Sequence, residues 1–242
     1  MMDDRNAALP RLVLLPGMDG TGWLLENFAA ALPASLRPLI VRYPVDGCCS
    51  YPQVAEFLRT ARINSEPYVL LGESYSSVAA IQWAAANPAN LKGLVICVGF
   101  ATPPVHRPLR AISSLLTHLL PIMPRPRWLV RGLTIGPNTP AVVLRQLEKV
   151  RANVPASTFA ARMRAILHCD ARADLARIRV PIVFLHATHD RLVGSDKLKE
   201  MLAIQPSADA EIFPGPHLLL ELHSKQAAER ITEFIHERVE ES

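Results

Sequence analysis

Residues 68–80 read YVLLGESYSSVAA, and this stretch decides the fold. An apolar run over residues 68–71 leads straight into Gly72 and Ser74, and small side chains follow. The run is typical of a buried strand in a parallel sheet, and the small residues predict a helix that packs closely against it. Ser74 is therefore expected on a sharp strand-to-helix turn, where a serine hydroxyl can serve as a nucleophile.

Strand and helix patterns alternate on both sides of this stretch. Apolar runs predict six strands, over residues 12–15, 39–41, 68–71, 94–98, 182–186 and 210–213. Amphipathic or small-residue runs predict helices between them, over residues 23–32, 51–63, 76–86, 195–204 and 224–237. This alternation predicts an α/β fold, with a mostly parallel sheet of about six strands and helices on both faces.

The alternation breaks between residues 100 and 180. This segment has amphipathic helical runs over residues 109–119, 143–150 and 159–167, and no convincing strand pattern. We therefore expect a core formed by residues 1–99 and 181–242, with residues 100–180 inserted as a helical cap.

Composition places the chain among soluble globular proteins. It has 242 residues, of which 50% are hydrophobic, so one large domain can form without disulfides. Its four cysteines form no C-x-x-C pair, and its N-terminus has neither the basic nor the long apolar part of a signal peptide. No uncharged apolar stretch is long enough to span a bilayer. The sequence predicts a cytoplasmic protein without a transmembrane segment.

A serine nucleophile requires a base and an orienting carboxylate, and the sequence offers both. Asp190 follows the fifth predicted strand, and His217 follows the sixth. Both residues are therefore expected at the carboxyl edge of the sheet, together with Ser74. The chain order Ser, Asp, His across three such loops predicts a catalytic triad.

Other assignments of these residues are open to test. His186, His189 and Asp190 form an H-x-x-H-D pattern that a metal site could use, although no companion ligand cluster accompanies it. Asp190 and His217 could be ordinary loop residues. The alternative acids are Asp196 at a predicted helix start, and Asp170 and Asp174 in the inserted segment.

An oxyanion hole would complete such a site. One backbone N–H is expected from Tyr75, directly after the nucleophile, and the other from Met18 in the loop after the first strand. That loop reads PGMDGTG over residues 16–22.

A nucleotide-binding loop is the competing interpretation of residues 16–22. However, the glycine order is G-x-x-G-x-G, and the acidic residue expected after the second strand is absent.

Taken together, these motifs resemble the α/β-hydrolase superfamily, and in particular the small bacterial serine carboxylesterases with a PGMDGTG oxyanion loop. Ser74, Asp190 and His217 match the nucleophile, acid and base positions of that superfamily, and residues 101–179 match its helical cap. The chain departs from the pattern at Pro16 and Glu73, where histidines are common, and at Ser76, which replaces the second glycine of G-x-S-x-G.

The resemblance implies a serine carboxylic ester hydrolase that forms an acyl-enzyme on short- to medium-chain esters. It implies no cofactor and no metal. The alternatives are a thioesterase or acyltransferase acting on carrier-linked acyl groups, and a catalytically silent binding protein on the same scaffold.

Charge is distributed unevenly along the chain. Residues 100–181 carry 13 basic and three acidic side chains, a net charge of +10, and the remainder carries 13 basic and 19 acidic side chains, a net charge of −6. A solvated cap surface explains this pattern, as does a cap that docks an acidic carrier or anionic substrate. Nucleic acid is not expected as a partner, because the arginines lack interleaved aromatic residues and a known binding motif.

Overall fold

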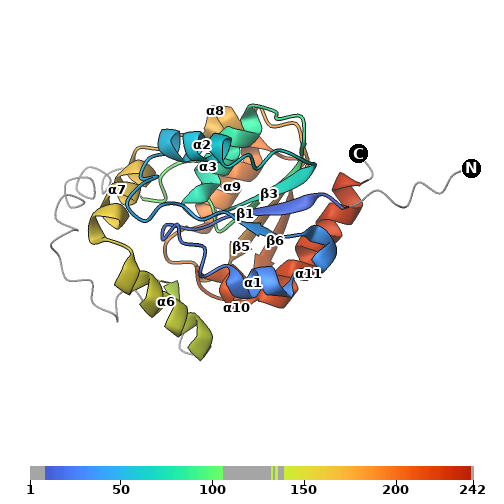
Figure 1. Ribbon diagram of the computed structural model, residues 1–242. Coiled ribbons are helices and arrows are strands. Elements are labelled where there is room, and N and C mark those ends of the chain that lie inside the picture. The colour runs from blue at the N-terminus through green and yellow to red at the C-terminus, as the bar shows by residue number, and fades with distance from the viewer. Residues whose placement is uncertain (1–8, 106–131, 133, 136–138, 241–242) are drawn as a thin grey trace, which may run out of the picture.

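The sheet has six strands, all parallel, in the order β2-β1-β3-β4-β5-β6 (Figure 1). The computed structural model describes residues 9–105, 132, 134–135 and 139–240. The strands are β1 (Arg11–Leu15), β2 (Leu39–Ile40), β3 (Tyr68–Glu73), β4 (Leu91–Cys97), β5 (Ile182–Ala187) and β6 (Asp209–Phe213). The predicted α/β class and parallel sheet are confirmed.

Helices connect the strands. Those in the described core are α1 (Glu26–Ala31), α2 (Tyr51–Thr60), α3 (Ser76–Ala85), α9 (Ser195–Ile204), α10 (Leu219–Leu222) and α11 (Ser224–Phe234), with a short 3₁₀ turn η1 (Ala34–Leu36) and a π turn η2 (Ile235–Val239). The helix predicted over residues 23–32 begins only at Glu26. Strand β4 starts three residues before the predicted strand, because Leu91 pairs with Tyr68 at the start of β3.

The two faces of the sheet support separate parts of the hydrophobic core. Along β1, Val13 and Leu15 pack into the cluster under α2, α3 and α9, whereas Leu12 and Leu14 pack into the cluster under α1 and α11. This alternation follows from the two-residue period of a strand. A sheet covered on both faces needs apolar residues at both sets of positions, as the sequence of β1 provides.

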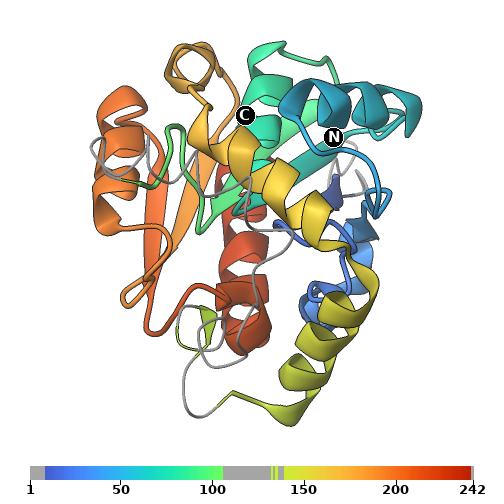
Figure 2. The same cartoon turned by 90° about the vertical axis from the view of Figure 1, so that its left-hand side faces the viewer.

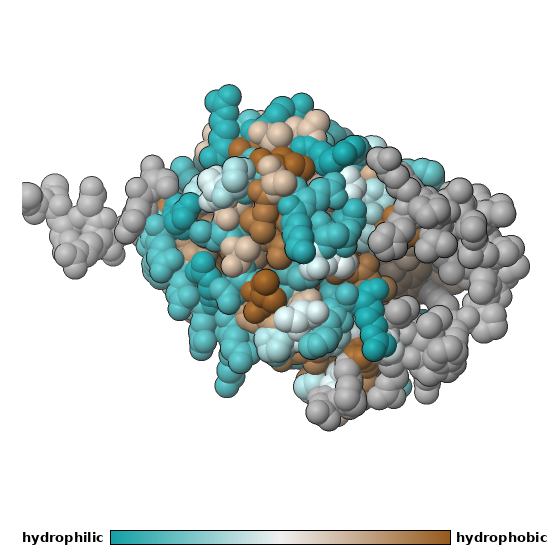
Figure 3. All heavy atoms as spheres, turned by 180° about the vertical axis from the view of Figure 1, so that it is seen from behind, coloured by the Kyte–Doolittle hydropathy of each residue, from teal (hydrophilic) through white to brown (hydrophobic). Residues whose placement is uncertain are grey.

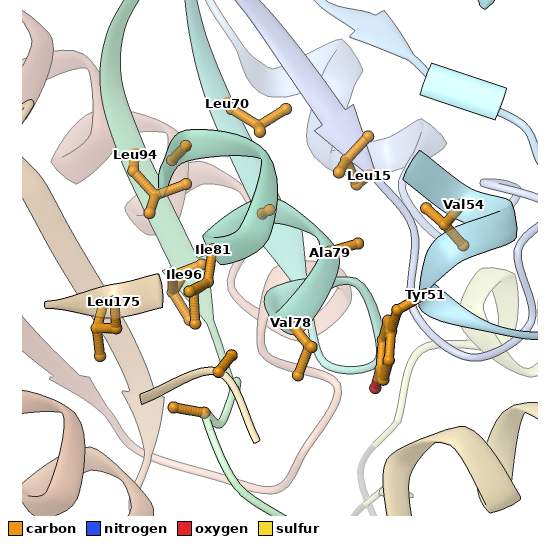
Figure 4. Packing of buried hydrophobic residues seen from close by; sticks show 14 of the residues in the cluster. Leu15, Tyr51, Val54, Leu70, Val78, Ala79, Ile81, Leu94, Ile96 and Leu175 are labelled. Carbon is orange, nitrogen blue, oxygen red and sulfur yellow. The ribbon is translucent and has the colours of Figure 1, made fainter. Parts of the chain in front are cut away.

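Helix α3 packs closely against β3 and begins just after Ser74. Val78 and Ala79 face Tyr51 of α2, and Ile81 lies beside Ile96 of β4 (Figure 4). A Cβ atom on Gly72 would lie 2.6 Å from Ala80 Cβ and 2.8 Å from Ser76 O. Only glycine therefore allows the strand and the helix to approach this closely.

Three described helices lie between β4 and β5: α6 (Ala141–Asn153), α7 (Ala156–Leu167) and α8 (Arg172–Leu175). Figure 2 shows α7 crossing in front of the sheet and α6 continuing beside it. Gln146 of α6 donates to Trp23 O, and Thr158 of α7 donates to Val45 O, so both helices contact loops that follow strands. The helical runs predicted over residues 143–150 and 159–167 are confirmed, whereas the run over residues 109–119 lies outside the described residues.

The surface mixes hydrophobic and hydrophilic residues. On the face opposite to that of Figure 1, hydrophobic residues reach the surface among hydrophilic ones (Figure 3). Isolated apolar residues at the surface, such as Ile212 of the edge strand β6 with 56% exposure, are ordinary in globular proteins. Within the described ranges, no helix has the length and apolar character needed to cross a bilayer.

Candidate active site

Ser74 occupies the sharp turn between β3 and α3. Its φ angle is +49°, in the left-handed region that residues other than glycine rarely adopt. Ser74 N–H donates to Cys97 O of β4, and Ser74 O accepts from Ser77 N–H in the first turn of α3, so the strained conformation is held at both ends. Such a strained turn between a strand and a helix is typical of a serine nucleophile.

The structure brings Ser74, His217 and Asp190 together. His217 Nε2 lies 2.9 Å from Ser74 Oγ, and His217 Nδ1 lies 2.6 Å from Asp190 Oδ2. The side chains of His217 and Asp190 are 6% and 0% exposed, so water scarcely competes for their contact. The arrangement can move the proton of the serine hydroxyl to an imidazole whose other nitrogen faces a carboxylate.

Backbone contacts fix the orientation of Asp190. Its second carboxylate oxygen, Oδ1, accepts the N–H groups of Leu192 and Val193 at 2.8 and 2.9 Å. The neighbouring His189 N–H donates to Gly215 O, which joins the loop after β5 to the loop after β6. The carboxylate is therefore positioned relative to His217 by backbone hydrogen bonds.

The alternative acids and histidines lie in environments that differ from those of Asp190 and His217. Asp196 lies in the first turn of α9, and Asp170 and Asp174 pair with Arg172 and Arg177 at the surface. His189 is exposed and its Nδ1 contacts Thr188 Oγ1, whereas burial lowers the pKa of His186. In the described part of the chain, no three His, Cys, Asp or Glu side chains are grouped as metal ligands.

The loop after β1 leaves the Met18 N–H unpaired while its neighbouring polar backbone groups are occupied. Pro16 O accepts from Ser76 Oγ, Gly17 N–H donates to Glu73 Oε2, Gly17 O accepts from Gly20 N–H, and Met18 O accepts from Arg162. Neither Met18 N–H nor Tyr75 N–H has an acceptor among the residues that the structure describes. Both N–H groups therefore remain free for a ligand oxygen.

Ser76 accounts for one departure from the usual serine motif. Its hydroxyl is fully buried, donates to Pro16 O and lies 2.8 Å from the hydroxyl of Tyr43. Because the single Ser76 proton goes to Pro16 O, Tyr43 donates to Ser76. A second glycine at this position would leave the loop after β1 without this link to α3.

Glu73 forms a buried carboxyl pair with Glu221 of α10. Glu73 accepts Gly17 N–H at 3.0 Å, and desolvation raises its pKa to about 7. Desolvation and the neighbouring Glu73 raise the pKa of Glu221 well above its usual value. Two adjacent carboxyl groups in a dry site cannot both ionise at low cost, so burial favours the protonated form of Glu221. Neither carboxyl oxygen of Glu221 has a hydrogen-bond partner among the described residues. No sequence pattern indicates this pair, because Glu221 has the spacing of an ordinary helix residue.

This pair predicts a pH-dependent stability effect for Glu73→Gln. A carboxyl group whose pKa is raised to about 7 binds more protons in the folded state, so wild-type stability falls as the pH rises from about 4.5 to 7. Glutamine keeps an acceptor for Gly17 N–H but has no charge to desolvate. We expect Glu73→Gln to be more stable than wild type at pH 8, by up to about 3 kcal/mol, with the difference shrinking towards pH 5.

Urea unfolding at pH 5, 6, 7 and 8 measures this difference, with Glu229→Gln on the exposed face of α11 as the control. Parallel pH profiles for wild type and Glu73→Gln would show that Glu73 does not titrate in this range.

The parallel sheet, the serine turn and the Ser–His–Asp contacts define an α/β hydrolase. A sequence profile of the serine aminopeptidase S33 family matches residues 51–224, and the chain belongs to this family. A search of curated proteins gave no match.

Solved structures of several hydrolases share the fold. An esterase from Exiguobacterium antarcticum is 15% identical and superposes with a TM-score of 0.78, covering 94% of this chain and 92% of its own. A lipase-esterase related protein from Clostridium acetobutylicum is 15% identical, with a TM-score of 0.76 and coverage of 93% and 94%. An enol-lactonase from Burkholderia xenovorans is 18% identical, with a TM-score of 0.73 and coverage of 97% and 94%. These likenesses extend over almost the whole chain and establish the fold.

Proposed function

We propose that the protein is a serine carboxylic ester hydrolase acting through Ser74, His217 and Asp190. The continuous contact from Ser74 Oγ through His217 to Asp190 carries this proposal. The esterases among the structural neighbours support it as analogues of the fold.

In the proposed reaction, Ser74 Oγ attacks the ester carbonyl while His217 Nε2 takes the hydroxyl proton. Asp190 holds the imidazole in orientation and stabilises the imidazolium that forms. The N–H groups of Met18 and Tyr75 donate to the oxyanion of the tetrahedral intermediate. His217 then returns the proton to the leaving alcohol, and water releases the acid from the acyl-serine by the same steps.

An ester suits the described site better than a peptide. An aminopeptidase must bind the free ammonium group of its substrate, usually through carboxylates. Among the carboxyl groups around the serine turn, Asp19 accepts from Thr21, Glu73 accepts from Gly17 N–H, and Glu221 is buried away from solvent. An ester substrate needs no such group.

A fluorophosphonate probe tests the proposed nucleophile directly. We expect stoichiometric labelling of Ser74, located by peptide mapping, and hydrolysis of p-nitrophenyl esters of short to medium chain length. Amino-acid p-nitroanilides, assayed in parallel, are expected to react more slowly. An unlabelled, correctly folded protein would favour a silent binding protein, and faster cleavage of the anilides would favour a peptidase.

The same triad supports thioester cleavage or acyl transfer, and the inserted segment bears on that choice. We propose that residues 100–180 act as a cap over the site, and we retain an acidic carrier as a candidate partner of its basic surface. Arg162 is excluded from such a surface because it is fully buried. Five of the arginines, at positions 107, 110, 125, 127 and 131, lie outside the described residues.

The cytoplasmic location of the protein remains a prediction.

A further inference from the structure

Arg162 of α7 is the largest side chain that is fully buried in the described structure, and it is a cation. A buried guanidinium loses its hydration, so the protein must replace it with other polar contacts. For Arg162 these contacts are mostly backbone carbonyls, with a favourable electrostatic interaction with Asp19. This unusual environment indicates a specific role in the fold or in the reaction.

The guanidinium joins two loops that follow neighbouring strands. Arg162 Nη1 donates to Met18 O at 3.0 Å in the loop after β1. Its Nε and Nη2 donate to carbonyls in the loop after β2, namely Cys48 O at 3.3 Å, Gly47 O at 3.0 Å and Pro44 O at 3.3 Å. Lysine could not make these contacts together, because its three donors radiate from one atom.

The space around the guanidinium is closely fitted. A Cβ atom on Gly20, whose φ angle is +72°, would lie 2.4 Å from Arg162 Nη1. The rings of Tyr43 and Tyr75 lie with their centroids 5.8 and 5.9 Å from the guanidinium carbon. Tyr75 is the residue after Ser74, so Arg162 contacts both residues that carry the proposed oxyanion donors.

We propose that Arg162 is a positioning residue that holds the Met18 carbonyl, and through the Met18 main chain keeps the Met18 N–H in the orientation that stabilises the oxyanion. The inference rests on the proposed ester hydrolysis. Met18 O and Met18 N–H flank the same α-carbon and belong to adjoining peptide units. The unit with the N–H is held at Gly17 O by Gly20 N–H, and the next unit is held at Met18 O by Arg162, so loss of Arg162 frees residue 18 on one side and lets its N–H change direction. A helix of the inserted segment would thus contribute to the reaction without touching the substrate.

The test compares Arg162→Lys with Thr158→Val, a matched variant on the same helix. Thr158 is also buried and donates to Val45 O at 2.7 Å, so its replacement removes a bond from α7 to the loop after β2 but none to residue 18. We expect both variants to unfold at lower temperature than wild type. Only Arg162→Lys should lower kcat, by about 10- to 100-fold, with KM changed by less than about threefold.

Rates are expressed per serine labelled by the fluorophosphonate, so that unfolded protein does not count. Arg162→Gln replaces the lysine variant if the latter does not fold, and the same loss of kcat is expected. Equal effects on kcat in the Thr158 and Arg162 variants would overturn the positioning role. A rise in KM of Arg162→Lys with kcat unchanged would overturn it too. Failure of the wild type to react with the probe would instead overturn the proposed function.

Discussion

Replacing Ser74 by alanine is expected to lower kcat for p-nitrophenyl esters by at least about 10⁴-fold. In the proposed reaction the Ser74 hydroxyl forms the acyl-enzyme, and it lies 2.9 Å from His217 Nε2, the proposed base. Oxyanion stabilisation and substrate binding remain in the variant. We therefore expect a small residual rate that still exceeds the rate of uncatalysed hydrolysis in water.

The change should affect the reaction far more than the fold. Alanine has no more difficulty than serine in adopting a φ of +49°, and the backbone bonds of residue 74 to Cys97 and Ser77 are retained. Thermal unfolding should therefore change little, and fluorophosphonate labelling should be lost. Ser195→Ala, at the exposed start of α9, provides the control. Unchanged ester hydrolysis in Ser74→Ala would assign the nucleophile elsewhere.

Asp190→Asn is expected to lower kcat by about 10⁴-fold, although asparagine has the same size and shape as aspartate and can still contact His217. The Asp190 oxygen that accepts Leu192 N–H and Val193 N–H must remain an acceptor, so the amide oxygen of asparagine takes that place. The amide NH₂ group then faces His217 Nδ1 and donates to it. The imidazole proton is forced onto Nε2, and His217 can no longer accept a proton from Ser74.

Steady-state hydrolysis over pH 6 to 10 measures this loss, with Asp196→Asn as the matched control on α9. The control should retain wild-type rates, because Asp196 pairs with Lys197 at 3.8 Å and forms no hydrogen bond or ion pair with His217. If Asp190→Asn retained activity while Asp196→Asn lost it, the acid would have to be reassigned.

The sequence predicted the sheet and the three candidate residues because both depend on local patterns in chain order. An apolar run followed by a sharp polar turn identifies the carboxyl end of a strand, and parallel strands bring such ends to one edge. Ser74, Asp190 and His217 each follow a strand in this way. The short helices α8 and α10 were not predicted, and some boundaries differ, as at β4, where exposed Lys92 interrupts the apolar pattern near its start.

Residues whose importance depends on distant contacts could not be found in this way. Arg162 resembles the other arginines of its segment in sequence, yet it contacts Met18 and Cys48, more than 110 positions away. Glu221 has the spacing of a solvated helix residue, and its partner Glu73 was noticed only as a departure from a motif. Their roles follow from burial, which a single sequence encodes only weakly for charged residues.

The sheet order also determines when this site can exist during synthesis. Strands β1 to β4 are complete at Cys97, but β5 can join β4 only after the whole inserted segment has emerged from the ribosome. His217 follows later still, after β6. We expect closure of this long loop to slow the pairing of β4 with β5, because its conformational entropy is lost before the pairing is gained. A nascent chain that ends before residue 217 therefore carries Ser74 without His217. Under the proposed mechanism, we expect hydrolytic activity only when the last strand has joined the sheet.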